Sequence, residues 1–139
     1  MTKIMIVEDE QDIREMIDLY LQKEGFETFT AENGADFLQK IDTFQPDLVT
    51  LDVMMPGLTT GEILEKLKQK SISPKIILLT VCRYAEEEQK ELFNRGNIVD
   101  YITKPFDLDY LLERINRQVI CKQNLQPTHD LKAYQRIPS

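Results

Sequence analysis

The most informative stretch of this 139-residue chain is LVTLDVMMPG, residues 48–57. Its apolar first half is bounded by Pro46 and by Pro56-Gly57 and is too short for a helix, which predicts a buried strand. The strand ends at a single carboxylate, Asp52. Because ligands bind beyond the carboxyl ends of strands in open α/β sheets, we expect Asp52 at the mouth of a crevice.

Short apolar runs alternate with segments of helical periodicity along the rest of the chain. Further strands are predicted at residues 4–7, 26–31, 76–79 and 98–102. Helices are predicted around residues 13–21, 37–41, 63–67, 85–95 and 108–119. The strand predicted at residues 26–31 has a weaker apolar pattern, because it mixes in Thr and Glu, and it is expected at a sheet edge. The acidic helix over 85–95 has few apolar residues and is expected to dock least firmly.

Five alternations of strand and helix predict an α/β fold. Right-handed βαβ units would build a five-stranded parallel sheet with helices on both faces. The length suits one domain, which is predicted to cover residues 1–125. The segment 126–139 is polar, contains two prolines and is predicted to be a tail or a linker stub.

Composition excludes several classes of protein. The apolar runs are too short to cross a bilayer, and acids at residues 8–10 interrupt the start, so a cytoplasmic location is expected. A net charge of −7 argues against direct nucleic-acid binding, which requires clustered Lys and Arg. Cys82 and Cys121 have no metal-ligand spacing, and His129 is the only His, which argues against a zinc site or a His-based triad.

The ends of the predicted strands carry chemically useful side chains. Since the carboxyl ends of parallel strands share one edge, we expect convergence of Glu8, Asp9, Asp52, Thr80 and Lys104. Three crowded carboxylates repel each other, and Mg²⁺ prefers oxygen ligands, so a magnesium site is predicted. Lys104 and Thr80 can bind phosphoryl oxygens. An ionised Asp can attack phosphorus and form an aspartyl phosphate.

Each of these residues alone has a simpler structural explanation. Asp52 could occupy a turn, and Glu8-Asp9-Glu10 could cap the first helix at its positive end. Thr80 is an ordinary strand former, and Lys104 is an ordinary loop cation. Because four separate strands each end in a group suited to Mg²⁺ or phosphate, the joint pattern favours a phosphoryl site.

Four segments resemble the receiver domain of bacterial two-component response regulators, over Lys3 to about Leu125. They are IMIVEDE at 4–10, LVTLDVMMPG at 48–57, IILLT at 76–80 and DYITKPF at 100–106. The resemblance implies the flavodoxin-like sheet with strand order 2-1-3-4-5, an order that is typical of this kind of protein.

The resemblance also implies roles for individual residues. Asp52 would be the phosphoacceptor. Asp9 and Asp52 would bind Mg²⁺ directly, the Met54 carbonyl would be a third ligand, and Glu8 would act through water. Lys104 would contact the phosphoryl group, and the peptide bond that follows it would be cis.

A switch and an output face are implied in the same way. Thr80 and Tyr101 resemble the family's switch pair, which biases two conformations of the face built from the fourth helix, fifth strand and last helix. A half-buried strand aromatic is an equally compatible interpretation of Tyr101. Asp100 and Arg114 resemble residues of the ion pairs that join dimers of transcription-factor members, which leaves a homodimer through the last helix face open.

The function implied is a signalling switch rather than an enzyme. A sensor histidine kinase or a histidine phosphotransfer protein would phosphorylate Asp52, and the changed surface would select an effector domain or protein. The domain would catalyse only its own phosphorylation and dephosphorylation.

Three alternatives come from other classes. A receiver-like module could bind partners without phosphorylation. A phosphohydrolase of the haloacid dehalogenase type would need a second Asp where Met54 stands. An FMN carrier would place its phosphate against an acidic mouth.

Two segments differ from the usual receiver pattern. The loop between Pro56 and Gly61 is one residue longer, and the segment from Thr80 to Lys104 is about two residues longer. Loop insertions cost little free energy, so the fold is expected to be kept.

Overall fold

The computed structural model describes residues 1–81, 83–95 and 97–123. Cys82, His129 and the predicted tail at 126–139 therefore lie outside the described residues. The strands are β1 (Lys3–Val7), β2 (Glu27–Ala31), β3 (Leu48–Asp52), β4 (Lys75–Thr80) and β5 (Ile98–Thr103). The helices are α1 (Gln11–Lys23), α2 (Gly34–Phe44), α3 (Thr60–Gln69), α4 (Glu86–Phe93) and α5 (Leu108–Gln123).

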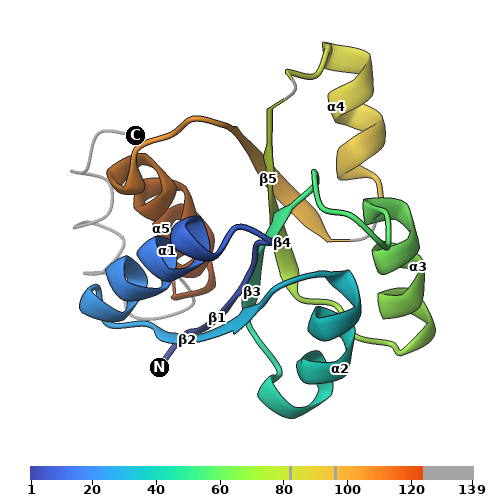
Figure 1. Ribbon diagram of the computed structural model, residues 1–139. Helices are drawn as coiled ribbons and strands as arrows, with labels where there is room; N and C mark the ends of the chain where they lie inside the picture. Colours follow the sequence, from blue (N-terminus) through green and yellow to red (C-terminus); the bar gives the residue numbers. More distant parts are fainter. Residues whose placement is uncertain (82, 96, 124–139) are drawn as a thin grey trace.

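All five strands are parallel, in the order β2-β1-β3-β4-β5. Helices α1 and α5 cover one face of this sheet, and α2, α3 and α4 lie on the other (Figure 1). The predicted α/β class, strand order and edge position of β2 are thus confirmed. Strand β3 is the central strand of this order and lies between β1 and β4. The carboxyl end of β3 therefore lies between the carboxyl ends of β1 and β4.

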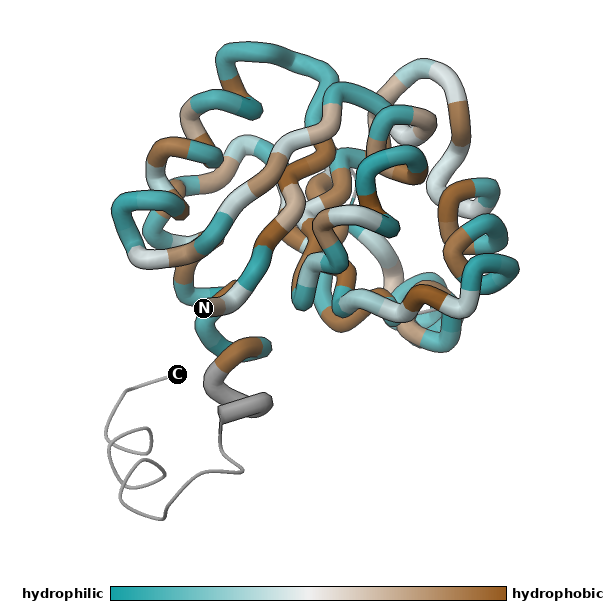
Figure 2. The backbone as a smooth tube through the Cα atoms, turned by 90° about the horizontal axis from the view of Figure 1, so that it is seen from below, coloured by the Kyte–Doolittle hydropathy of each residue, from teal (hydrophilic) through white to brown (hydrophobic). Residues whose placement is uncertain are grey.

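Alternate side chains of the central strands fill two separate cores, because successive residues of a strand point to opposite faces. Met5, Val49 and Leu78 belong to the core under α2 and α3. Ile6 and Leu79 belong to the core under α1 and α5. Figure 2 shows the hydrophobic segments gathered on the strands between the helices, with hydrophilic segments on the outer turns. Burial on both faces explains why these strands read as continuous apolar runs.

Helix α4 is shorter than the predicted 85–95 and is held weakly. None of its eight residues, all of them described, is buried, and Leu92 only packs at the margin of a core. The side chain of Glu88 accepts a hydrogen bond from the backbone N–H of Ala85, 2.9 Å away, which stabilises the first turn. The expectation that this helix docks least firmly agrees with its lack of a buried residue.

No helix within the described ranges is both long and apolar enough to cross a membrane.

The loop that follows β3 ends in a capping box at the start of α3. The Thr59 hydroxyl accepts from the N–H of Glu62 at 3.1 Å, and the Glu62 carboxylate accepts from the N–H of Thr59 at 2.8 Å. The longer loop is therefore closed by ordinary helix-capping chemistry.

Replacing Thr59 should show how much this closure contributes. Thr59→Ala removes the side-chain acceptor and is expected to lower the free energy of unfolding by about 1 kcal/mol. Urea unfolding followed by circular dichroism measures it, with Thr60→Ala in the next position as the matched control. An equal loss in both variants would mean that the capping box does not stabilise this loop.

Candidate functional site

The carboxyl edge of the sheet carries a cluster of three carboxylates. Asp52 is the last residue of β3 and is 2% exposed, and Glu8 directly follows β1 and is fully buried. Asp9 is exposed beside them. One carboxylate oxygen from each of the three lies within 4.8 Å of the others. The predicted convergence of these side chains is therefore observed.

Lys104 joins the cluster from the end of β5. Its Nζ lies 3.1 Å from Glu8 Oε1 and 3.3 Å from Asp52 Oδ2. Its backbone N–H donates to the carbonyl of Thr80 at 2.7 Å, which fixes the loop after β5 to the end of β4. The peptide bond from Lys104 to Pro105 is cis, as the resemblance implied.

Backbone geometry holds the other side of the Asp52 carboxylate. The N–H of Met54 donates to Asp52 Oδ1 at 3.0 Å, and the N–H of Val53 continues the strand pairing to Leu79 at 3.0 Å. The two oxygens of Asp52 therefore have different partners, a backbone N–H on one and an ammonium on the other. The Met54 side chain is 60% exposed and leaves the mouth of the site open.

The residues predicted as the switch lie next to this site. Thr80 ends β4 and is buried, while Tyr101 of β5 is half-buried. The Tyr101 ring meets the edge of the Tyr84 ring, with centroids 5.0 Å apart and planes at 78°. Tyr84 lies in the segment before α4, so an aromatic contact connects β5 to that segment.

Asp100 and Arg114 pair with each other inside the chain. Asp100 is 8% exposed, and Arg114 Nε donates to its Oδ2 at 2.6 Å while Nη2 bonds its Oδ1. Arg114 also donates to the hydroxyl of Tyr110 and lies over that ring, 5.3 Å from the centroid. The charges of Asp100 and Arg114 therefore already offset each other within one chain.

Within the described residues, the structure shows no side-chain hydrogen bond that caps the first helix. Glu10 occupies the N-cap of α1, but its side chain accepts no hydrogen bond from the described backbone. Glu8 Oε2 instead accepts from the N–H of Glu10 at 3.3 Å. Glu8 and Asp9 thus belong to the acidic cluster, whereas Glu10 is exposed at the start of the helix.

Comparisons with known proteins agree with this geometry. The family described as "Response regulator receiver domain" matches residues 4–116. The chain belongs to this family. Sporulation initiation phosphotransferase F of Bacillus subtilis is 34% identical over 126 residues, which cover 88% of this receiver and 97% of that protein. As a receiver domain of a two-component response regulator, the chain is not a conventional enzyme, and its chemistry is of the autophosphorylation type.

Other relatives are longer. The alkaline phosphatase synthesis transcriptional regulatory protein PhoP of Bacillus subtilis is 32% identical over 94% of this receiver, but the match covers 53% of that protein. This receiver thus spans about half the length of such curated relatives. Receiver domains of this kind interact with histidine kinases and with effectors.

Solved structures share the fold. The CheY-like receiver from Methanospirillum hungatei JF-1 is 27% identical and superposes with a TM-score of 0.78, over 91% of this receiver and 99% of that chain. The response regulator TrrA from Thermotoga maritima, solved in complex with Mg²⁺-BeF, is 36% identical with a TM-score of 0.70, over 84% of this receiver and 98% of that chain.

The acidic cluster of this receiver can hold a divalent cation. Its donors are three carboxylates with close oxygens, which is the set that a hard cation such as Mg²⁺ prefers. Lys104 alone offsets the charge of two of them, Glu8 and Asp52. The donor set therefore fits the cation that the family implies.

The pKa shifts of Glu8 and Lys104 reflect the crowding of charged groups in the cluster. The pKa of Glu8 is raised to about 7, first by burial and then by the hydrogen bond with Asp52, while Lys104 acts in the opposite direction. Burial alone would lower the pKa of Lys104, but its hydrogen bond to Glu8 and the charges of both carboxylates raise it above its ordinary value. Without a cation, Glu8 is therefore partly protonated near neutral pH.

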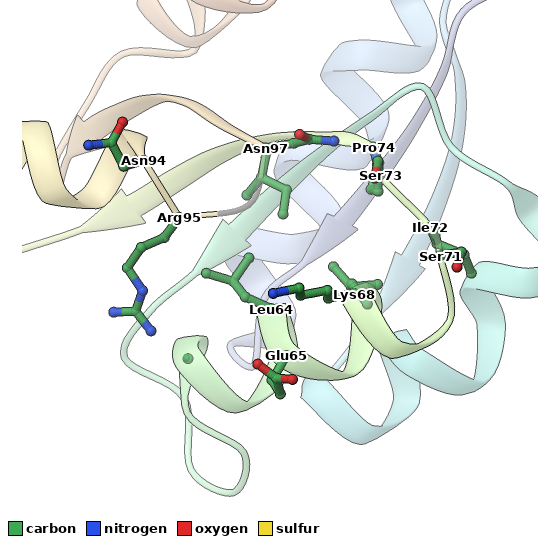
Figure 3. A pocket seen from close by; sticks show the side chains of 13 residues that line it. Leu64, Glu65, Lys68, Ser71, Ile72, Ser73, Pro74, Asn94, Arg95 and Asn97 are labelled. Atoms are coloured by element: carbon green, nitrogen blue, oxygen red, sulfur yellow. The ribbon is translucent and has the colours of Figure 1, made fainter.

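Among the clefts on the described part of the receiver, one borders the cluster and another lies away from it. A cleft of about 740 Å³ between the β1–α1, β2–α2 and β3–α3 loops is lined by residues that include Asp9, Arg14 and Leu58. A cleft of about 460 Å³ lies along α3, where Leu64, Lys68, Arg95 and Asn97 face it (Figure 3). Ser73 and Asn97 precede β4 and β5, so this second cleft opens toward the amino ends of the strands, away from the carboxylates.

Sequence reasoning missed three side chains. Arg14 reaches back to the loop that carries Glu8 and Asp9, Tyr84 contacts Tyr101, and Tyr110 contacts Arg114. The spacing of Tyr110 and Arg114, four residues apart on a helix, was an available signal. Helix side chains lean toward the amino end, but this tendency does not say which loop carbonyl groups Arg14 would meet.

The raised pKa of Glu8 predicts a pH dependence in metal-free buffer. A carboxyl group whose pKa is about 7 when folded and 4.5 when unfolded binds more protons in the folded state between those values. The free energy of unfolding in EDTA should therefore fall as pH rises from 4.5 to 7.

Glu8→Gln is the control, because it removes the titrating group and keeps the shape. Urea unfolding across this pH range should show a smaller decline in Glu8→Gln than in the wild type. Parallel declines in the two proteins would contradict the assignment to Glu8.

Proposed function

We propose that this receiver is a phosphorylation-activated switch that accepts a phosphoryl group on Asp52 with Mg²⁺. The observation that carries the proposal is the placement of Asp52, buried at the end of β3, between the N–H of Met54, the ammonium of Lys104 and the acidic residues Glu8 and Asp9. The Asp52 carboxylate thus lies next to a cation and to two further oxygen ligands for a metal ion.

The protein side chains divide the work of the transfer. An oxygen of Asp52 attacks phosphorus. The bond between phosphorus and the donor's imidazole nitrogen breaks, and its electron pair stays on that nitrogen. The Lys104 ammonium would move its contact from the carboxylates to a phosphoryl oxygen, and its 3.3 Å distance from Asp52 supports this role.

Magnesium would be held by Asp9, Asp52 and the carbonyl of Met54, with Glu8 acting through water. Bound Mg²⁺ would offset the negative charge that otherwise repels a phosphoryl donor. The close approach of three carboxylates and the raised pKa of Glu8 support a site that requires added positive charge.

Thr80 and Tyr101 would carry the signal from the site. The Thr80 hydroxyl would contact the phosphoryl group, and the Tyr101 ring would then change its packing against Tyr84. The output face would include Asp100, Tyr101 and Arg114. Burial of Thr80 next to the cluster and the ring contact of Tyr101 support the pair.

The phosphodonor is proposed to be a sensor histidine kinase or a histidine phosphotransfer protein in the cytoplasm. The receiver unit would cover residues 1–125, with 126–139 as a polar tail or linker to a downstream effector domain or protein. The net charge of −7 supports an output without direct nucleic-acid contact by this domain. A homodimer through the α5 face would have to exchange the Asp100–Arg114 pair between chains.

Intact mass after incubation with acetyl phosphate tests the phosphoacceptor. The wild type should gain one phosphoryl adduct with Mg²⁺ and none in EDTA, and Asp52→Asn should gain none because it lacks the attacking oxygen. Folded wild type that forms no adduct under either condition would favour the alternative, a receiver-like interaction module that acts without phosphorylation.

If Thr80 and Tyr101 act as a switch pair, a mutation should be able to abolish the conformational response without abolishing phosphorylation. Thr80→Val keeps the size of the side chain but removes its hydroxyl, so it should still form the adduct while losing most of the phosphorylation-induced change in the Tyr101 ring signals. Nuclear magnetic resonance of ring-labelled tyrosine measures this change, with Thr103→Val at the end of β5 as control. A full response in Thr80→Val would remove Thr80 from the switch.

A further inference from the structure

Arg14 folds back from α1 onto the loop that carries the acidic residues. It lies one turn into the helix and is half-buried. Its Nη1 donates to the carbonyl of Glu8 at 2.9 Å and lies 3.5 Å from the carbonyl of Asp9. A single guanidinium nitrogen therefore contacts two successive carbonyl groups of the β1–α1 loop.

These two carbonyls flank the Cα of Asp9. The Glu8 carbonyl belongs to the peptide group before Asp9, and the Asp9 carbonyl belongs to the peptide group after it. Because peptide groups are planar, holding both of them restricts the two backbone dihedrals of Asp9. The direction of the Asp9 Cα–Cβ bond then follows from the backbone.

The other acidic side chains of the cluster have partners of their own. Asp52 is bonded by Met54 and Lys104, and Glu8 is bonded by Lys104 and by the N–H of Glu10. Asp9 is exposed, and among the described residues none donates a hydrogen bond to its carboxylate. The hydrogen bonds that restrain it belong to the loop backbone, and they come from the Arg14 guanidinium and from the Glu8 N–H bond to Ala31 at 3.1 Å.

The positive charge of Arg14 also reaches beyond this loop. Burial would raise the pKa of Asp36 in α2, but the hydrogen bond from Lys40 and the positive charges of Lys40 and Arg14 hold it below its ordinary value. Arg14 therefore acts both as a donor to the loop and as a cation near a crowded set of acids. The two roles can be separated, because Lys keeps the charge without the planar fork of donors.

We propose that Arg14 is a positioning residue for the metal site, which orients the Asp9 carboxylate by holding the two peptide groups on either side of it. The inference rests on the proposed function in one respect, since it takes Mg²⁺ as the ion that Asp9 helps to bind. It adds a residue that touches neither the phosphoryl group nor the ion. Side chains that orient metal ligands in this indirect way commonly change affinity by tenfold or more when removed.

Direct titration of the full chain with MgCl₂ by isothermal calorimetry, without phosphodonor, tests the proposal. Arg14→Gln should raise the dissociation constant for Mg²⁺ by about tenfold. Arg14→Lys should be impaired almost as much as Arg14→Gln. Lys23→Gln removes the same charge from the same helix without contact to the loop, and its dissociation constant should stay near that of the wild type.

The rate of adduct formation with acetyl phosphate, measured against Mg²⁺ concentration, distinguishes a positioning role from a general loss of structure. In Arg14→Gln the Mg²⁺ concentration for half-maximal rate should rise, while the rate at saturating Mg²⁺ should return to that of the wild type. Thermal unfolding checks that each variant is folded, and Arg14→Lys carries the test if Arg14→Gln does not fold.

Four results would overturn the inference. An unchanged Mg²⁺ affinity in Arg14→Gln would show that Asp9 needs no such support. Wild-type affinity in Arg14→Lys, or an equal loss in Lys23→Gln, would assign the effect to charge rather than to position. If the wild type itself bound no Mg²⁺, both this inference and the proposed function would fail, whereas a wild type that binds Mg²⁺ and forms the adduct would leave only the role of Arg14 at issue.

Discussion

Mutual repulsion between three carboxylates is the constraint around which this receiver is built. Glu8, Asp9 and Asp52 come together only because β1 and β3 are neighbouring parallel strands, so the topology that forms the sheet also creates the electrostatic cost. Lys104, from β5 on the far side of β4, offsets part of that cost, and a proton held near Glu8 offsets more. The fold and the site therefore share one electrostatic cost, which a bound divalent cation would reduce further.

The elements that were predictable from sequence are those with two-sided burial. The strands that end at Val7, Asp52 and Thr80 are covered on both faces, so their apolar runs had no competing interpretation, and the residues that follow them could be placed on one edge. The boundaries of α4 were less predictable, since it has no buried residue and its sequence therefore carries a weak pattern.

Contacts between loops were beyond sequence reasoning. Both longer segments meet in the structure, because a Cβ on Gly61 would lie 2.9 Å from Nη2 of Arg95. The absence of a side chain at Gly61 thus admits an arginine from the other longer segment. The Arg14 contact belongs to the same class, since it depends on where a short loop turns its carbonyl groups, and no residue pattern encodes that direction.

The shallow attachment of α4 has a thermodynamic consequence for signalling. A helix that removes no side chain fully from water can open or shift at a small fraction of the free energy that unfolds the whole domain. The ring contact between Tyr84 and Tyr101 is one of the attachments between its amino-terminal side and the sheet. A change of a few ångströms at the carboxylates then needs only a modest difference in interaction energy to repopulate the positions of this helix, and the rigid core is left undisturbed.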